Sequence, residues 1–130
     1  MDVRNLILQA VRAKSNAYAP YSNFYVGASV LTEDNSIYTG CNIENASYGA
    51  TNCAERTAIF NAVTNGHKYI KAICVMGDEN NYTFPCGICR QVIAEFSDDK
   101  TQIIIAKNEN EYIIKSLKEI LPEAFTRKNL

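Results

Sequence analysis

The chain has 130 residues, of which 47% are hydrophobic and 21% charged, and its formal net charge is −1. These values are typical of one compact domain and exclude a disordered, collagen-like or coiled-coil chain. The near-neutral charge argues against a nucleic acid as partner, because polyanion binders usually carry a basic surface. No apolar run reaches the ~18 residues of a membrane span and no signal peptide is evident, so we expect a cytoplasmic protein without a membrane partner.

The first part of the chain predicts a helix, a hairpin and a loop. A helix is expected over residues 2–17, where apolar residues recur at helical spacing before Pro20. Two strands are expected over 25–32 and 37–41, around the turn Asp34-Asn35-Ser36. Residues 42–52 are rich in Asn, Ser and Gly and predict a loop.

The remaining elements alternate between helix and strand. In chain order they are a helix at 53–65, a strand at 70–76, a polar loop at 78–84, a helix from about 86, strands at 103–106 and 112–114, and a short helix opened by a capping box at 116–119. The order αββαβαββα predicts a single α/β domain over residues 1–130, with a mixed five-stranded sheet flanked by helices. The last two strands are expected to be antiparallel, because a parallel crossover needs a longer connection.

Two short motifs carry the chemistry, Cys53-Ala54-Glu55 and Pro85-Cys86-Gly87-Ile88-Cys89. Cys86 and Cys89 are three apart on a predicted helix and share a face, and Cys53 stands at another helix start, so all three could bind one zinc ion. No fourth Cys or His lies near either motif, and three ligands leave the open position of a catalytic zinc site. His67 lies at the far end of the 53–65 helix and is expected on a surface loop.

The charges around this cluster point to two further residues. Three thiolates and one zinc ion sum to −1, which opposes formation of a hydroxide nucleophile. Helix N-termini at Cys53 and Cys86 offset this charge, and Arg56 could donate to the Cys53 sulfur and temper the charge of the thiolates without binding the metal itself. Glu55 is the nearest acid and the candidate proton carrier. It is two residues from Cys53, so it reaches the metal only if Cys53 occupies the helix cap.

Less specific interpretations exist for each motif taken alone. Asn52 and Glu55 could form a helix cap, and Cys86-x-x-Cys89 could be a redox pair or half of a structural zinc site. The other two cysteines, Cys41 and Cys74, lie in predicted strands and are expected to be buried thiols. The combination of three cysteines, an adjacent glutamate and no fourth ligand favours a catalytic zinc centre.

Both motifs match the zinc deaminase signature in its three-cysteine form. The chain resembles the short homotetrameric cytidine deaminases over nearly its whole length. The resemblance also includes Ala19-Pro20-Tyr21-Ser22, the run from Phe24 to Ala28, the run from Gly40 to Tyr48, and Leu121-Pro122-Glu123-Ala124-Phe125.

That resemblance implies one Zn²⁺ per chain and hydrolytic deamination of cytidine and deoxycytidine in pyrimidine salvage. It implies zinc-activated hydroxide attack at C4, with Glu55 as the proton shuttle. Asn42 and Glu44 match residues that hold the ribose hydroxyls. Phe24 matches an aromatic residue that lies beside the pyrimidine. The implied substrate-binding set is Phe24, Asn42, Glu44, Ala46, Tyr48, Ala54 and Phe125. Ala46, Tyr48 and Phe125 match residues that act across a subunit interface in a homotetramer.

Three other functions compete with deamination of free cytidine and deoxycytidine. A deaminase of bases within RNA or DNA would need a basic groove, which the charge does not favour. A deaminase of a nucleoside antibiotic of the blasticidin type would share the zinc and the glutamate and differ in ribose recognition. A structural zinc module would need a closed set of four ligands.

Overall fold

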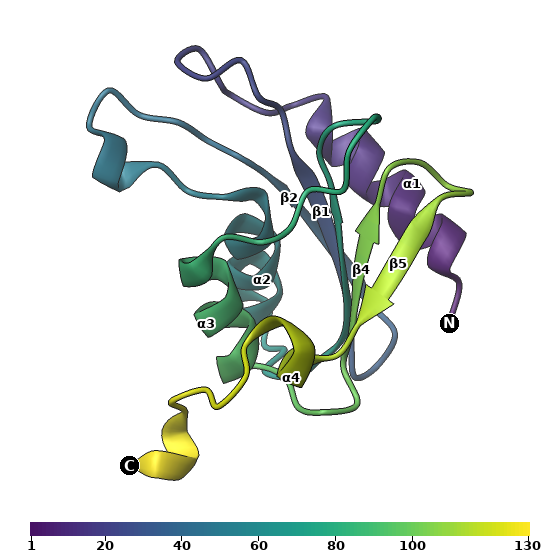
Figure 1. The fold of residues 1–130 in the computed structure, drawn as a ribbon, viewed down its shortest axis with the longest axis vertical. Helices are drawn as coiled ribbons and strands as arrows, with labels where there is room; N and C mark the ends of the chain where they lie inside the picture. The colour runs from purple at the N-terminus through teal and green to yellow at the C-terminus, as the bar shows by residue number, and fades with distance from the viewer.

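A mixed sheet of five strands forms the middle layer of the computed structural model, which describes residues 1–130 (Figure 1). The strands are β1 (Gly27–Thr32), β2 (Ile37–Cys41), β3 (Ile70–Met76), β4 (Gln102–Ala106) and β5 (Tyr112–Lys115), in the spatial order β2-β1-β3-β4-β5. Only β3 and β4 run parallel, and the other neighbouring pairs are antiparallel. The predicted mixed sheet and the antiparallel β4–β5 pair are confirmed.

Helices cover both faces of this sheet (Figure 1). The helix α1 (Val3–Lys14) packs on one face, and α2 (Ala54–Thr64), α3 (Gly87–Glu95) and the short α4 (Leu117–Ile120) lie on the other. Two single-turn 3₁₀ helices, η1 (Tyr48–Ala50) and η2 (Arg127–Asn129), lie in the loop after β2 and near the C-terminus. No helix is both long and apolar enough to cross a membrane.

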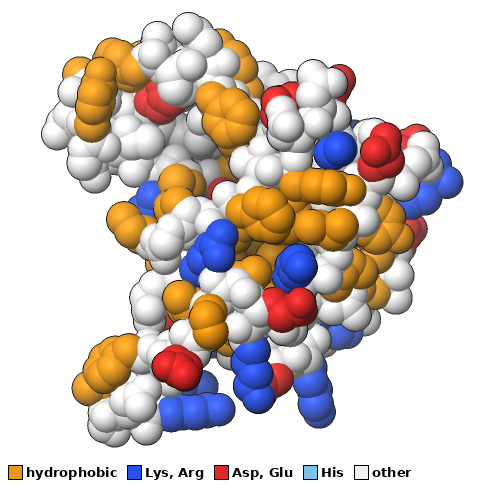
Figure 2. Space-filling view, viewed as in Figure 1, with side chains coloured by type: hydrophobic (Ala, Val, Ile, Leu, Met, Phe, Trp, Pro, Cys, Tyr) orange, Lys and Arg blue, Asp and Glu red, His pale blue; other side chains and the backbone are white.

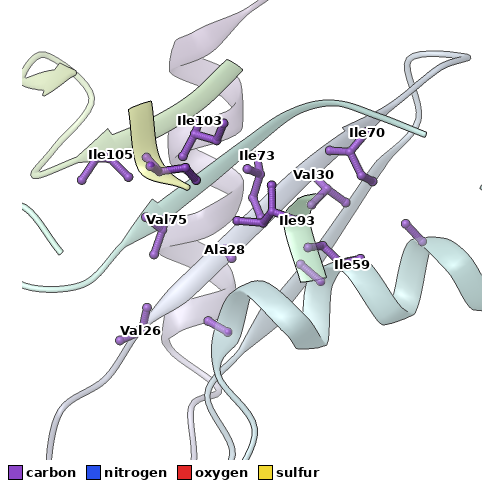
Figure 3. Packing of buried hydrophobic residues seen from close by; sticks show 14 residues of the cluster. Val26, Ala28, Val30, Ile59, Ile70, Ile73, Val75, Ile93, Ile103 and Ile105 are labelled. Atoms are coloured by element: carbon purple, nitrogen blue, oxygen red, sulfur yellow. The ribbon is translucent and has the colours of Figure 1, made fainter. Parts of the chain in front are cut away.

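The core is divided by the sheet into two hydrophobic clusters. Between α1 and the sheet, Leu6 and Ile7 pack against residues such as Cys74 and Ile104. On the other side, 14 buried residues fill the space between the sheet, α2 and α3, among them Ile59, Ile73 and Ile93 (Figure 3). Strand β3 contributes to both clusters, which explains its almost continuous apolar sequence.

A close approach at Gly40 places the N-terminal end of α2 against the sheet. A Cβ atom at Gly40 of β2 would lie 2.3 Å from the backbone nitrogen of Ala58 and 2.8 Å from the carbonyl oxygen of Ala54. Only glycine permits this contact, because any side chain would push the helix away. The contact lies one turn from Cys53 and therefore helps to position the start of the helix that carries the site.

Two predicted boundaries were too wide. Helix α1 ends at Lys14 rather than residue 17, where the Ser15 hydroxyl donates to the carbonyl oxygen of Arg12 at 2.6 Å and competes with the helical pattern. Strand β1 begins at Gly27 rather than residue 25. Before it, the Val26 N–H donates to the Asn42 side chain at 2.9 Å instead of joining a strand ladder.

Candidate active site

Three cysteine side chains from two helix starts meet at one point. Cys53 is the N-cap of α2 and Cys86 the N-cap of α3, both with extended backbone, and Cys89 lies in the first turn of α3. Their sulfur atoms all lie within 4.8 Å of one another, and the Cys53 and Cys86 sulfurs are 3.7 Å apart. The convergence expected from the spacing of the motifs is therefore present, at the positive ends of two helix dipoles.

The spacing of the sulfurs fits a zinc ion. Tetrahedral coordination with Zn–S bonds of ~2.3 Å places neighbouring sulfurs ~3.8 Å apart, close to the observed separation of Cys53 and Cys86. No further Cys, His, Asp or Glu atom joins the group. His67 instead bonds Glu33 at 3.1 Å beside the β1–β2 turn. The cluster can hold one metal ion and leaves a fourth position open.

Arg56 lies against the cluster, as its spacing from Cys53 suggested. Its Nη2 atom donates to the Cys53 sulfur at 3.3 Å, and its buried Nε has no hydrogen-bond partner in the protein. The Cys89 thiol, then Arg56 and Cys86, donate to the Cys53 sulfur and lower the pKa of Cys53 to about 5. Donating to Cys53 raises the pKa of Cys89. Of these sulfurs, Cys53 is therefore the one whose thiolate form the surrounding donors favour.

Glu55 was expected to reach the metal only if Cys53 occupies the helix cap, and Cys53 does occupy it. Because Cys53 is an N-cap with extended backbone, the helical spacing rule does not separate its side chain from that of Glu55. Both residues line the same pocket, in which Glu55 is only 5% exposed. Burial raises the pKa of Glu55 to about 7, and the nearby Cys53 charge adds to the shift. A carboxyl group in this setting can exchange protons near neutral pH.

The pocket beside the cluster has a volume of about 270 Å³, just below the ~300–1,000 Å³ that is typical of small-molecule sites. It contains two carboxylates and no lysine or arginine. Its lining consists of Ser22, Phe24, Val26, Asn42, Glu44, Thr51, Cys53, Ala54, Glu55, Thr83, Phe84 and Cys86. Five residues expected at the substrate site or as proton carrier, Phe24, Asn42, Glu44, Ala54 and Glu55, are therefore brought together.

Asn42 and Glu44 are held by the segment that precedes β1. The Asn42 amide accepts from the Val26 N–H at 2.9 Å and donates to the Phe24 carbonyl oxygen at 2.7 Å. Glu44 accepts from the backbone N–H groups of Tyr21 and Ser22 and from the Ser22 hydroxyl, which lowers its pKa. Each side chain has further hydrogen-bonding capacity that can face the pocket.

Three of the expected binding residues lie outside this pocket. Ala46 and Tyr48 belong to the exposed loop around η1, and the Tyr48 ring packs edge-on against Tyr21 with centroids 5.8 Å apart. Phe125 lies in the C-terminal segment and is 63% exposed. In Figure 1 the η1 loop and the C-terminal segment both extend away from the sheet. Within one chain, none of the three reaches the cluster pocket.

Other side chains differ from the sequence-based expectations. Ser22, Thr51, Thr83 and Phe84 line the pocket and were not predicted as site residues. Phe84 directly precedes Pro85-Cys86 in the sequence, and this position could have indicated that Phe84 lies at the site.

Cys74 is buried, as expected, which raises its pKa to about 12. Cys41 is only half-buried, because it ends an edge strand, and the His67 side chain is largely covered rather than exposed.

Such a centre is that of the zinc-dependent deaminases, in which three ligands leave one position for water and a nearby glutamate carries protons. The family model for the cytidine and deoxycytidylate deaminase zinc-binding region matches residues 2–105. The chain belongs to this family.

Curated relatives and a solved structure agree with the match. The cytidine deaminase of Sporosarcina psychrophila is 45% identical over 130 residues, covering 100% of this chain and 96% of the relative. That of Halalkalibacterium halodurans is also 45% identical, with 100% and 98% covered. The crystal structure of cytidine deaminase from Burkholderia pseudomallei superposes with a TM-score of 0.90 at 43% identity, covering 96% and 100% of the two chains. These relatives do not favour the nucleoside-antibiotic alternative.

Proposed function

We propose that the chain catalyses hydrolytic deamination of cytidine and deoxycytidine to uridine and deoxyuridine, with release of ammonia. The observation that carries this proposal is the buried Glu55 side chain in the same pocket as the three-cysteine cluster. Relatives called cytidine deaminase, 45% identical over the full chain, support the choice of substrate.

In this reaction Cys53, Cys86 and Cys89 hold the zinc ion. When bound, zinc acts as a Lewis acid that makes water a nucleophile near neutral pH. Glu55 takes a proton from the water that attacks C4 and passes it to N3 of the ring. It then takes the proton of the resulting C4 hydroxyl and passes it to the amino group, so that the C4=O bond forms as the C4–N bond breaks and ammonia leaves. Arg56 donates to the Cys53 sulfur and reduces the negative charge of the ligand set.

The remaining pocket residues orient the nucleoside. Phe24 would lie beside the pyrimidine ring, and both Phe24 and Ala54 line the pocket. Asn42 and Glu44 bind the ribose hydroxyls with an amide and a carboxylate, groups that suit hydroxyl partners. Glu44 stays ionised for this role, because the N–H and hydroxyl donors around it lower its pKa.

We further propose that sites are shared between the subunits of a homotetramer. Ala46, Tyr48 and Phe125 would complete the pocket of a neighbouring subunit, which accounts for two aromatic side chains that are 74% and 63% exposed in one chain. Residues 1–130 act as a single catalytic domain. The five free cysteines suit a reducing cytoplasm, where the enzyme would serve pyrimidine salvage.

The test of the activity is the loss of cytidine absorbance, followed with and without a zinc chelator. We expect turnover by the purified protein, loss of turnover after chelation, and recovery when zinc is added back. Metal analysis should give one zinc per chain. Absence of turnover in protein that contains one zinc per chain would refute the proposed substrate but not the metal site.

The charge of the pocket predicts discrimination between nucleosides and nucleotides. Glu44 and Glu55 line it, and none of its lining residues is a lysine or arginine that could pair with a phosphate. We therefore expect kcat/KM for cytidine monophosphate and its deoxy form to be at least ~100-fold below that for the nucleosides, since like charges repel and desolvation of the phosphate is uncompensated. Comparable kcat/KM values for cytidine and its monophosphate would contradict this prediction.

A further inference from the structure

Of the three clustered cysteines, Cys86 is the least held by its surroundings. Cys89 is buried within α3 and Cys53 is half-buried at the start of α2, whereas Cys86 is exposed at the end of the loop that follows β3. A ligand on an exposed loop needs other contacts to keep its sulfur in place. The hydrogen bonds to the carbonyl groups on either side of its Cα both come from one residue, Arg90.

Arg90 fixes the peptide groups on both sides of Cys86. Its backbone N–H donates to the Cys86 carbonyl oxygen at 3.0 Å, as in any helix, but its side-chain Nε also donates to the Pro85 carbonyl oxygen at 2.7 Å. The carbonyl groups before and after the Cys86 Cα are thus both bonded to the same residue. This arrangement restricts rotation of the backbone that directs the Cys86 sulfur.

The same guanidinium reaches the start of the C-terminal segment. Its Nη1 donates to the carbonyl oxygen of Ile120, the last residue of α4, at 2.8 Å. The next residue, Gln91, donates to the Phe125 carbonyl oxygen at 2.8 Å. Two adjacent residues of α3 therefore bond the C-terminal segment at Ile120 and at Phe125, and Figure 1 shows this segment passing beside α3.

The Arg90 charge is not used for an ion pair. None of the five salt bridges includes Arg90, and its partly buried side chain donates only to backbone carbonyl groups. Partly burying a cation without a carboxylate partner is costly, so the two bonds are the interactions that retain it. The planar guanidinium can bond two carbonyl groups in different directions, which a lysine cannot do with the same geometry.

We propose that Arg90 is a positioning residue that holds Cys86 in register with the metal and couples this ligand to the C-terminal segment bearing Phe125. The proposal rests on the proposed function, because it deepens the role of the same centre. It predicts that loss of the Arg90 side chain loosens the metal, even though Arg90 touches neither metal nor substrate.

The experiment measures the release of zinc from the loaded protein into an excess of a chromogenic chelator. We expect Arg90→Gln to release zinc ~10-fold or more faster than the wild type, because replacing a group that orients a metal ligand typically costs ~10–100-fold in metal affinity. Arg90→Lys should also release zinc faster, by a smaller factor, because an ammonium group reaches one carbonyl rather than both. This milder variant decides the question if Arg90→Gln does not fold.

Two matched controls separate positioning from general stability. Gln91→Ala removes only the bond to Phe125, and Ser97→Ala removes a 2.6 Å bond from the Ser97 hydroxyl to the Ile93 carbonyl oxygen at the other end of α3. Both should release zinc at the wild-type rate. In protein loaded with Co²⁺ instead, the thiolate charge-transfer band should change in the Arg90 variants and remain unchanged in the two controls.

Wild-type release rates in both Arg90 variants, together with an unchanged Co²⁺ spectrum, would overturn the inference. So would equally fast release in Ser97→Ala, which would assign the effect to helix stability. These outcomes differ from failure of the proposed function, in which the wild type itself would bind no zinc or would not deaminate cytidine.

Discussion

At the scale of single residues, the site depends on a carboxyl group that is kept away from water. Glu55 is buried at the start of α2, and its burial raises its pKa toward neutrality. Burial of an acid without a cationic partner disfavours its charged form and is generally unfavourable for stability. In the proposed function such a group serves chemistry rather than folding, and this role would distinguish a catalytic from a structural zinc module.

The variant Glu55→Gln should therefore distinguish a catalytic zinc module from a structural one. The amide has nearly the same volume but cannot carry a proton, so we expect kcat for cytidine to fall by at least ~10²–10⁴-fold. Zinc content should remain one per chain, because Glu55 is not among the clustered ligands. Absorbance assays and metal analysis measure both quantities. Turnover near the wild-type level would show that another group moves the proton.

At the scale of elements, the sequence predicted the order and type of every strand and α-helix and the convergence of the cysteines. Helical spacing and two helix starts were sufficient for Cys53, Cys86 and Cys89. The pocket residues Thr51 and Thr83 could not be found in this way, because they belong to loops whose paths depend on contacts distant in sequence. The predicted start of β1 was wrong for the same reason, because the N–H of the preceding residue, Val26, donates to the Asn42 side chain.

The turn between β1 and β2 shows how local polar contacts fix an element. Asn35 adopts φ 67°, a left-handed conformation that asparagine tolerates, and this explains why the turn does not need glycine. Asp34 accepts from the Thr32 hydroxyl at 2.7 Å and from the Ser36 N–H at 3.1 Å. These donors lower the pKa of Asp34 from 3.8 to about 2.

The Asp34 contacts predict a pH-dependent contribution to stability. Because the folded-state pKa lies below the unfolded value, the contribution is complete above pH 3.8 and is lost as the pH falls toward 2. We expect Asp34→Asn to lower the urea midpoint at neutral pH, with the difference from the wild type shrinking as the pH falls from 4 to about 2. Comparing the two proteins at each pH cancels the effect of metal loss. A constant difference would contradict the prediction.

At the scale of the whole molecule, one chain leaves several apolar side chains uncovered. Tyr112 and Ile114 of β5 are 38% and 44% exposed, and Figure 2 shows hydrophobic side chains gathered on the face that β5 occupies in Figure 1. Tyr48 and Phe125 are also exposed, and they belong to the η1 loop and the C-terminal segment, which extend away from the sheet in Figure 1. Exposed groups of this kind are typical of protein–protein interfaces. The proposed homotetramer would cover these groups, with neighbouring chains completing each pocket.

Subunit mixing tests whether Phe125 acts on a neighbouring site. Phe125→Ala removes the aromatic group but leaves Glu55, and Glu55→Gln does the reverse, so each homo-oligomer should have low activity. If Phe125 serves a neighbour, hybrids contain sites with Glu55 from one variant and Phe125 from the other. Random mixing should restore about a quarter of the wild-type activity, because each requirement is met in half of the sites.

The mixture must be unfolded and refolded together, and separately refolded proteins mixed afterwards provide the control. Recovery only in the co-refolded sample would establish a shared site, whereas no recovery would mean that Phe125 acts within its own chain or not at all. Light scattering on the same samples should give a mass of about four chains, as expected for a closed symmetric tetramer. A fully active monomer would contradict the shared site, because Phe125 does not line the pocket of its own chain.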